Sequence, residues 1–138
     1  MDRALLVPYT HVPNLRGENI LRPLLPVTLS HEGKSIEATG LIDSGSDISI
    51  LPYSIGQRLG LIWDEHRALI GLSGNLRQTP AQGVGLMAQV GDFQSVMLMF
   101  AWIEAENAPL IFGQISFFMK FDVCFHRSAE VFDIRNRS

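Results

Sequence analysis

Hydrophobic residues in this chain recur either with a period of two or in short unbroken runs, and glycine or proline separates the runs. Residues 25–30 (LPVTLS) alternate, residues 31–34 (HEGK) carry turn residues, and residues 35–43 alternate first and then become fully apolar. Such patterns are typical of short β-strands joined by tight turns. Further strands are expected at residues 48–51, 84–90, 93–103, 123–126 and 130–134.

Two segments favour helix. Tyr53–Leu59 begins directly after Pro52 and stops before Gly60, and these residue types commonly mark the start and end of a helix. Residues 113–121 (GQISFFMKF) could form one or two turns of helix. The chain is therefore predicted to be mostly β, and its many short strands fit a compact barrel or sandwich.

Two other segments are less regular. Residues 68–80 (ALIGLSGNLRQTP) are predicted to form a β-hairpin with Gly71 and Gly74 at its tip. Residues 1–23 contain three of the seven prolines and no sustained period. They are predicted to be an extended N-terminal arm, with one short strand near Leu5–Val7, ahead of a single domain at residues 24–138.

Composition narrows the function classes. A chain of 138 residues fits one domain. With 46% hydrophobic and only 18% charged residues, it is unusually apolar for its size. One explanation is that part of its surface is covered by a second copy of the chain. The net charge of −3 and the lack of a Lys/Arg run give no sign of nucleic acid or anionic membrane as a partner. Without a signal peptide or membrane span, a cytoplasmic protein is expected.

The cysteine and the histidines give little indication of a metal site or of redox chemistry. Cys124 is the only cysteine, so no internal disulfide can form, and its apolar surroundings (FDVCF) predict a buried, inert thiol. The four histidines are scattered without the spacing of metal ligands. The sequence therefore predicts neither a metal site nor a cofactor.

The stretch LIDSGSDISILP, residues 41–52, places a carboxylate between two apolar runs. Three interpretations compete. Asp43 and Ser44 could form an Asx-turn with Gly45, or the loop could bind calcium, although it lacks the alternating ligands and distal glutamate of an EF-hand. Because apolar flanks would bury the loop, the third interpretation is favoured: a catalytic carboxylate at the end of a buried strand.

This stretch resembles the signature of the retropepsin-like aspartic proteases, an apolar strand, Asp-Ser/Thr-Gly-Ala/Ser and a second apolar strand. Residues 70–74 (IGLSG) look like the family's mobile flap, and residues 110–113 (LIFG) look like the element through which its catalytic loop is threaded. The resemblance covers roughly residues 25–134. It implies a closed, acid-protease-like β-barrel of short strands with one or two short helices, one lobe per chain.

The resemblance also implies a function. Aspartic proteases use two carboxylates that share one proton to activate a water, yet this chain has only one Asp-Ser/Thr-Gly triplet. A homodimer is therefore expected, with Asp43, Ser44 and Gly45 of each copy forming the catalytic centre. Such an enzyme would be an endopeptidase that cleaves extended, hydrophobic segments of a peptide or protein.

Substrate-binding residues follow from the same resemblance. Leu72, Val84 and Ile111 would supply apolar pocket walls, and the Ser46 hydroxyl would donate to the catalytic carboxylate and move the activity optimum to lower pH. The expected substrate-binding residues are Ser46, Asp47, Gly71, Leu72, Ser73 and Gly74.

The sequence departs from the family at Gln114, where retroviral members carry an arginine that pairs with the acid equivalent to Asp47. Asp47 would then need another partner: a backbone N–H, solvent, or an arginine of the arm such as Arg3, Arg16 or Arg22. One rival function is therefore a binding or dimerisation module that cleaves little. A weaker rival is a phosphorylation-dependent degradation signal at Asp-Ser-Gly with Ser49.

Overall fold

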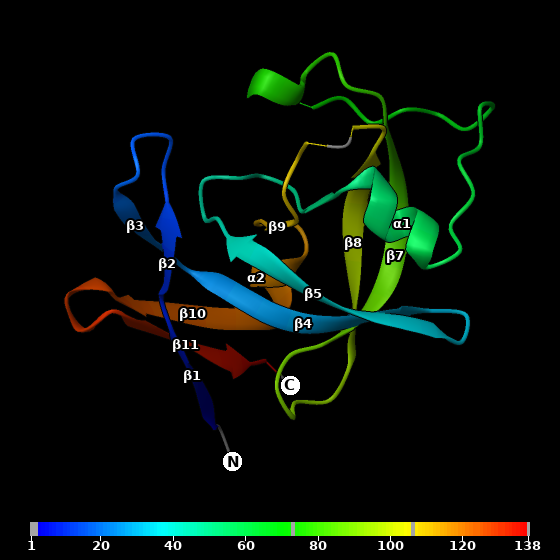
Figure 1. The fold of residues 1–138 in the computed structure, drawn as a ribbon. Helices are drawn as coiled ribbons and strands as arrows, with labels where there is room; N and C mark the ends of the chain where they lie inside the picture. Colours follow the sequence, from blue (N-terminus) through cyan, green and yellow to red (C-terminus); the bar gives the residue numbers. More distant parts are fainter. Residues whose placement is uncertain (1–2, 73, 106, 138) are drawn as a thin grey trace.

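The computed structural model describes residues 3–72, 74–105 and 107–137, and it is built mostly from β-strands with two short α-helices (Figure 1). The N-terminal strands are β1 (Ala4–Pro8), β2 (Thr10–Pro13) and β3 (Asn19–Arg22). The central strands are β4 (Leu24–His31), β5 (Lys34–Ile42), β6 (Ile50–Leu51), β7 (Ala81–Gln89), β8 (Val96–Ile103) and β9 (Ile111–Phe112). The C-terminal strands are β10 (Phe121–His126) and β11 (Val131–Asn136), and the helices are α1 (Tyr53–Arg58) and α2 (Phe117–Lys120).

Six strands form a closed barrel in the order β4-β5-β9-β6-β8-β7, with β7 pairing back to β4. Leu25, Val27 and Leu29 of β4 point into the core, while the residues between them are more exposed or face outward, as the alternating pattern predicts. The predicted mostly-β fold with one lobe per chain is confirmed. The strands expected from the sequence have boundaries within three residues of those observed, whereas β2, β3 and β9 were not predicted.

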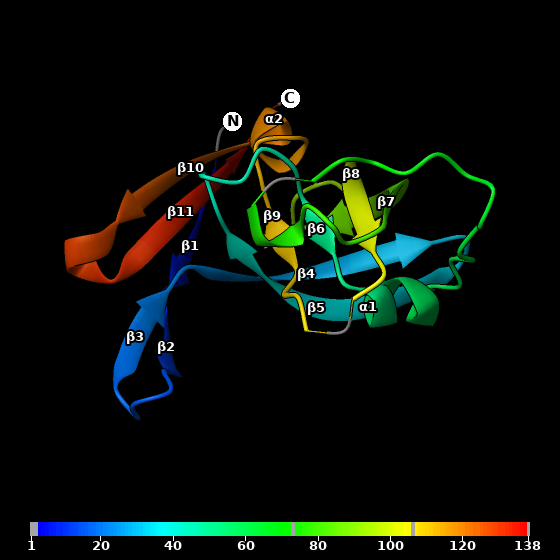
Figure 2. The same ribbon diagram turned by 90° about the horizontal axis from the view of Figure 1, so that it is seen from above.

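A second, three-stranded sheet lies beside the barrel in the order β1-β11-β10. The strand expected at Leu5–Val7 is found within β1, which pairs antiparallel with β11 and brings the two ends of the chain together. The rest of the predicted arm is not simply extended, because β2 and β3 form a hairpin that projects away from the barrel (Figure 2).

Aromatic side chains join the barrel to this sheet. The Phe117 ring of α2 lies 4.9 Å from the rings of both Phe112 in β9 and Phe121 in β10, measured between ring centroids. All three side chains are fully buried, and stacked or tilted aromatic contacts add to the hydrophobic gain of burial. Helix α2 therefore connects the segment after β9 to the second sheet.

Helix α1 is fixed on the barrel by Trp102. The Trp102 ring stacks on Tyr53 at 5.3 Å, and its Nε1–H donates to the Tyr53 carbonyl at 3.2 Å. A Cβ at Gly56 would lie 2.2 Å from Trp102 Nε1, so only glycine lets the helix approach this closely. The helix predicted at Tyr53–Leu59 is confirmed to within one residue.

Two sequence predictions are wrong. The hairpin expected at residues 68–80 is absent from the described residues, which show an irregular segment followed by one 3₁₀ turn at Gly74–Leu76. Cys124 was expected to be buried but is exposed, because β10 is an edge strand of its sheet and Cys124 points outward from it. An apolar local sequence does not bury a residue when no second layer covers its face of the strand.

The part of the chain that the structure describes contains no helix that is long and apolar enough to cross a membrane.

Candidate active site

Asp43 follows directly after β5, where that strand runs parallel to β9. The Asp43 N–H donates to the Phe112 carbonyl at 3.0 Å, and the Leu41 N–H donates to the Leu110 carbonyl at 2.9 Å. The backbone up to and including Asp43 is thus held by the barrel. The carboxylate itself is half-buried at the barrel end.

Residues 43–46 turn sharply. The Gly45 N–H donates to Asp43 Oδ1 at 3.0 Å, and the Ser46 N–H donates to the Asp43 carbonyl at 3.2 Å. The first contact is also that of an Asx-turn, so it fits two of the three interpretations equally well. The surroundings of the loop distinguish between them.

The backbone that follows β9 packs closely against residues 46–48. The Gln114 N–H donates to the Ser46 carbonyl at 2.8 Å, and the Ile115 N–H donates to the Asp47 carbonyl at 2.9 Å. A Cβ on Gly113 would lie 2.4 Å from the Ile48 carbonyl oxygen, a distance that real Cβ atoms do not reach. The loop is therefore threaded past Gly113 as expected from LIFG, and a solvated turn would need no such support.

Ser49 is a supporting residue that the sequence analysis missed. It is fully buried, and its Oγ accepts a hydrogen bond from the Gly113 N–H at 3.0 Å. Because buried polar groups nearly always have a partner, a lone hydroxyl in the apolar run ISIL could have indicated this contact. A buried Ser49 also argues against the degradation signal, which needs an exposed segment.

The resemblance was wrong about the Ser46 hydroxyl. Ser46 Oγ donates to the Ile48 carbonyl at 2.7 Å, so its single proton stabilises the loop backbone rather than Asp43. The basis for a more acidic activity optimum is therefore lost.

Gln114 stands at the position where the resemblance places an arginine, and it makes a different contact. Its Nε2 donates to the Ser44 carbonyl at 2.8 Å, which ties the tip of the loop to the segment after β9. Asp47 is exposed, and Arg3 of the arm pairs with Asp92 instead of Asp47. Of the partners considered for Asp47, solvent therefore fits its exposed position, and the uncharged Gln114 amide holds the loop through the Ser44 backbone.

A groove of about 790 Å³ lies over the loop, with Asp43 in its wall. Of the expected site residues it brings together six: Asp43, Gly45, Ser46, Asp47, Gly71 and Leu72. Ser44 is exposed beside the groove, Gly74 lies outside its lining, and Ser73 is outside the described residues.

The apolar walls of the groove differ in part from those expected. Leu72 and Ile111 line it, whereas Val84 is buried in the barrel core. The sequence analysis did not assign the remaining lining residues: Ile48, Ile50, Leu76, Ala105, Asn107, Ala108 and Pro109. Four of them come from the turn after β8, a segment with no motif to mark it.

Another part of the groove wall is formed by the segment where a flap was expected. Ile70 N–H donates to the Ala81 carbonyl at 2.8 Å, and beyond it Gly71 and Leu72 reach the groove. This contact anchors the segment at the start of β7. The segment lines the same groove as Asp43, but its described residues do not form a β-hairpin.

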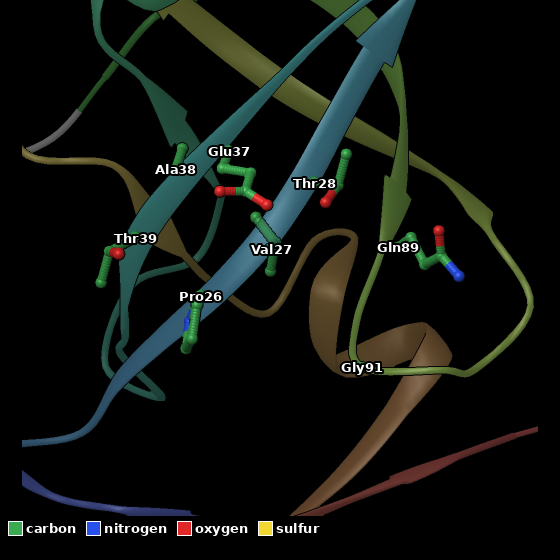
Figure 3. Close-up of a pocket in the computed structure, with 8 residues that line it drawn as sticks. All are labelled: Pro26, Val27, Thr28, Glu37, Ala38, Thr39, Gln89 and Gly91. Atoms are coloured by element: carbon green, nitrogen blue, oxygen red, sulfur yellow. The ribbon is translucent and has the colours of Figure 1, made fainter.

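A second hollow, of about 460 Å³, lies elsewhere on the barrel and shares no lining residue with the groove (Figure 3). Glu37 of β5 pairs in register with Thr28 of β4, and its carboxylate is directed toward that strand. Gln89 also neighbours Thr28, but its amide points away from the carboxylate. No convergent polar cluster forms among these residues, so the groove over Asp43 remains the stronger candidate.

Among the comparisons with known proteins, the one with solved structures bears on the fold. No family model and no curated protein matches the chain. Among solved structures, a retropepsin-like aspartic protease from Rickettsia conorii is similar over 99% of this chain and 93% of its own, with a TM-score of 0.61 and 13% identity. The EIAV protease in complex with an inhibitor covers 67% of this chain and 82% of its own, with a TM-score of 0.52 and 16% identity. The chain therefore has the retropepsin-like fold.

Proposed function

We propose that this chain is one half of a homodimeric aspartic endopeptidase whose catalytic pair is Asp43 from each of two copies. The observation that carries the proposal is the position of Asp43, on a threaded loop at the end of a barrel strand and in the wall of a groove. The similarity of the whole chain to a retropepsin-like aspartic protease supports it.

A second copy is required by the chemistry. General acid–base cleavage with aspartates needs one ionised and one protonated carboxyl around the same water. The chain has one Asp-Ser-Gly triplet, so a second, equivalent carboxylate comes from a copy related by a two-fold axis. The exposed loop residues Ser44 and Gly45 are then the ones that face the axis.

Substrate recognition follows from the groove. Apolar side chains of Ile50, Leu72, Leu76 and Ile111 line it, and the turn after β8 adds Ala108 and Pro109. An extended peptide can lie along it with main-chain hydrogen bonds to Gly71 or Gly45, much as an added strand would. The preferred substrates are therefore flexible segments with hydrophobic residues beside the cleaved bond.

The first test is cleavage of a mixed peptide library between pH 4 and 6 by wild type, Asp43→Asn and Asp122→Asn. Asp122 is an exposed aspartate on β10, so the same substitution there controls for the loss of a charge. A general acid–base group typically contributes about 10²–10⁴-fold to the rate. Asp43→Asn is therefore expected to lower kcat by about that factor or more. Cleavage that survives Asp43→Asn would refute the proposal.

The shared site is tested by mixing subunits. Unfolding and refolding equal amounts of wild type and Asp43→Asn leaves about one dimer in four with both aspartates, if the copies pair at random. Activity should fall to about that fraction of the wild-type dimer value, whereas a catalytic monomer would retain about half. A protein that dimerises but yields no product with any peptide is a binding module instead.

A further inference from the structure

The outer face of the sheet β1-β11-β10 brings together three metal-binding side chains that no comparison or motif assigns. Cys124 and His126 lie two residues apart on β10 and so point to the same face. Asp133 of β11 stands directly opposite Cys124 in the register. Pairing of the two strands therefore creates the cluster, which is why a search of the sequence for ligand spacing does not find it.

The ligand atoms lie close enough for one ion. The thiol sulfur, an imidazole nitrogen and a carboxylate oxygen all lie within 4.8 Å of one another. His126 Nε2 lies 2.9 Å from Asp133 Oδ2. A tetrahedral zinc with bonds of about 2.0–2.3 Å needs separations of about 3.3–3.7 Å between its ligands, which small side-chain rotations of Cys124 and His126 supply.

We propose that Cys124, His126 and Asp133 bind one zinc ion, with water at a fourth position. A soft thiolate together with an imidazole selects zinc over magnesium and calcium, which prefer all-oxygen sites. The carboxylate of Asp133 is only 10% exposed, so its position is set by packing, whereas His126 is 44% exposed and free to adjust. Asp133 would thus be a fixed ligand, while the exposed side chains of Cys124 and His126 can move to bind an ion that arrives from solution.

The charges around the cluster are compatible with a dication. A thiolate and a carboxylate carry two negative charges, which a zinc ion neutralises. Arg135 Nε lies 3.7 Å from Asp133 Oδ1, whereas His126 contacts the other carboxylate oxygen, Oδ2. The guanidinium thus orients the carboxylate from behind, as partners of metal ligands commonly do.

A bound ion would clamp the C-terminal hairpin. It would link β10, an edge strand with one neighbour, to β11, which pairs with β1 on its other side. Because the ligands come together only in the folded chain, binding stabilises the fold. The site is distinct from the Asp43 groove, whose lining includes none of the three residues.

The test uses tag-free, full-length protein at neutral pH, with zinc and cobalt ions as the probes. One equivalent of zinc is expected to bind, and cobalt is expected to give the thiolate charge-transfer and visible bands of a tetrahedral site. Cys124→Ser should abolish the charge-transfer band. Loss of a residue that only supports a metal ligand lowers affinity by about 10–100-fold, so Cys124→Ser and His126→Gln, which remove ligands, should each weaken zinc binding by more than that. Zinc should raise the Tm of wild type but of neither variant.

His31→Gln is the matched control, since His31 lies on β4 beside Glu32 and away from the cluster. It should leave zinc affinity unchanged. Because Cys124 is the only cysteine, its reaction with a thiol reagent reports the site directly, and zinc should slow that reaction. No stoichiometric binding, equal binding by Cys124→Ser, or unprotected Cys124 would each overturn the proposal and leave His126 and Asp133 as a hydrogen-bonded pair. None of these outcomes bears on Asp43.

Discussion

The two walls of the groove are built in opposite ways. On one side, the loop that carries Asp43 is held by the backbone after β9, by the buried Ser49 hydroxyl and by the Gln114 amide. On the other side, the described part of residues 68–72 is tied to the barrel by one backbone hydrogen bond, from Ile70 to Ala81. Local stability follows the density of such contacts, so the first wall is expected to be the more rigid.

The difference matches what a hydrolytic site needs. Catalytic groups act best when their supporting residues hold them in place, while the segment that covers a substrate must open and close. Glycines show the contrast most directly. At Gly113 an added methyl group would collide with the Ile48 backbone, whereas at Gly71 it would meet nothing within 4 Å.

Gly113→Ala and Gly71→Ala should therefore show the largest contrast. Gly113→Ala is expected to lower the free energy of unfolding by about 3 kcal/mol or more, because backbone on both sides of the clash is hydrogen-bonded and cannot move away. Gly71→Ala should change it by less than about 0.5 kcal/mol. Urea unfolding of the two variants measures the difference, and equal losses would remove the distinction between the walls.

Ser49→Ala probes the next strongest support of the loop. Removing Oγ leaves the Gly113 N–H buried without an acceptor, which should cost about 1–3 kcal/mol of unfolding free energy. Ser46→Ala is the control, since it removes a hydroxyl from a half-buried position and leaves only the Ile48 carbonyl without its donor. We expect a smaller loss there, of about 1 kcal/mol. A reversed order would show that the buried bond is not the main support.

Gln114→Ala tests whether the amide replaces the arginine. Its bond to the Ser44 carbonyl is exposed, so the unfolding free energy should fall by only about 0.5–1 kcal/mol. If the proposed function holds, peptidase activity should fall more than stability does, because the loop carries Asp43. Gln114→Glu keeps the size but replaces the donor with an acceptor, and it should be at least as damaging. Unchanged rates in both variants would assign no role to the amide.

Arg3→Ala supplies a reference far from both walls, and its effect should be the smallest. The side-chain hydrogen bond and the positive charge of Arg3 lower the pKa of Asp92, and both groups are exposed. A lowered pKa in the folded state means that the pair stabilises above the ordinary carboxyl pKa and loses this contribution as pH falls and Asp92 is protonated. Thermal unfolding should show a small Tm difference at neutral pH that disappears in acid and in high salt.

The alternation of hydrophobic and polar residues, together with the glycines and prolines between the runs, was enough to predict most of the fold. The strands β4 and β5, the helix after Pro52 and the C-terminal strand pair could be located because periodicity and turn residues are local properties of the chain. The position of Asp43 at a strand end could be predicted for the same reason.

Most of the failures concern contacts between distant segments. Residues 68–80 have the composition of a hairpin, but the described residues of this range show no strand pairing. The Ser46 hydroxyl found a nearer acceptor than Asp43, and Val84 turned inward. At residues 68–80 and at Val84 the local pattern allowed two environments, and the packing of other elements selected one. At Ser46 a hydrogen bond within the loop made the selection.

The sequence by itself thus determined the strands, the turn that carries Asp43 and, through its single Asp-Ser-Gly triplet, the need for a second copy if the chain cleaves peptides. The tertiary structure decided which residues support that turn, what lines the groove and that Cys124, His126 and Asp133 meet. The physical reason is range: backbone preferences act over a few neighbouring residues, whereas burial and side-chain partners depend on segments that only folding brings together.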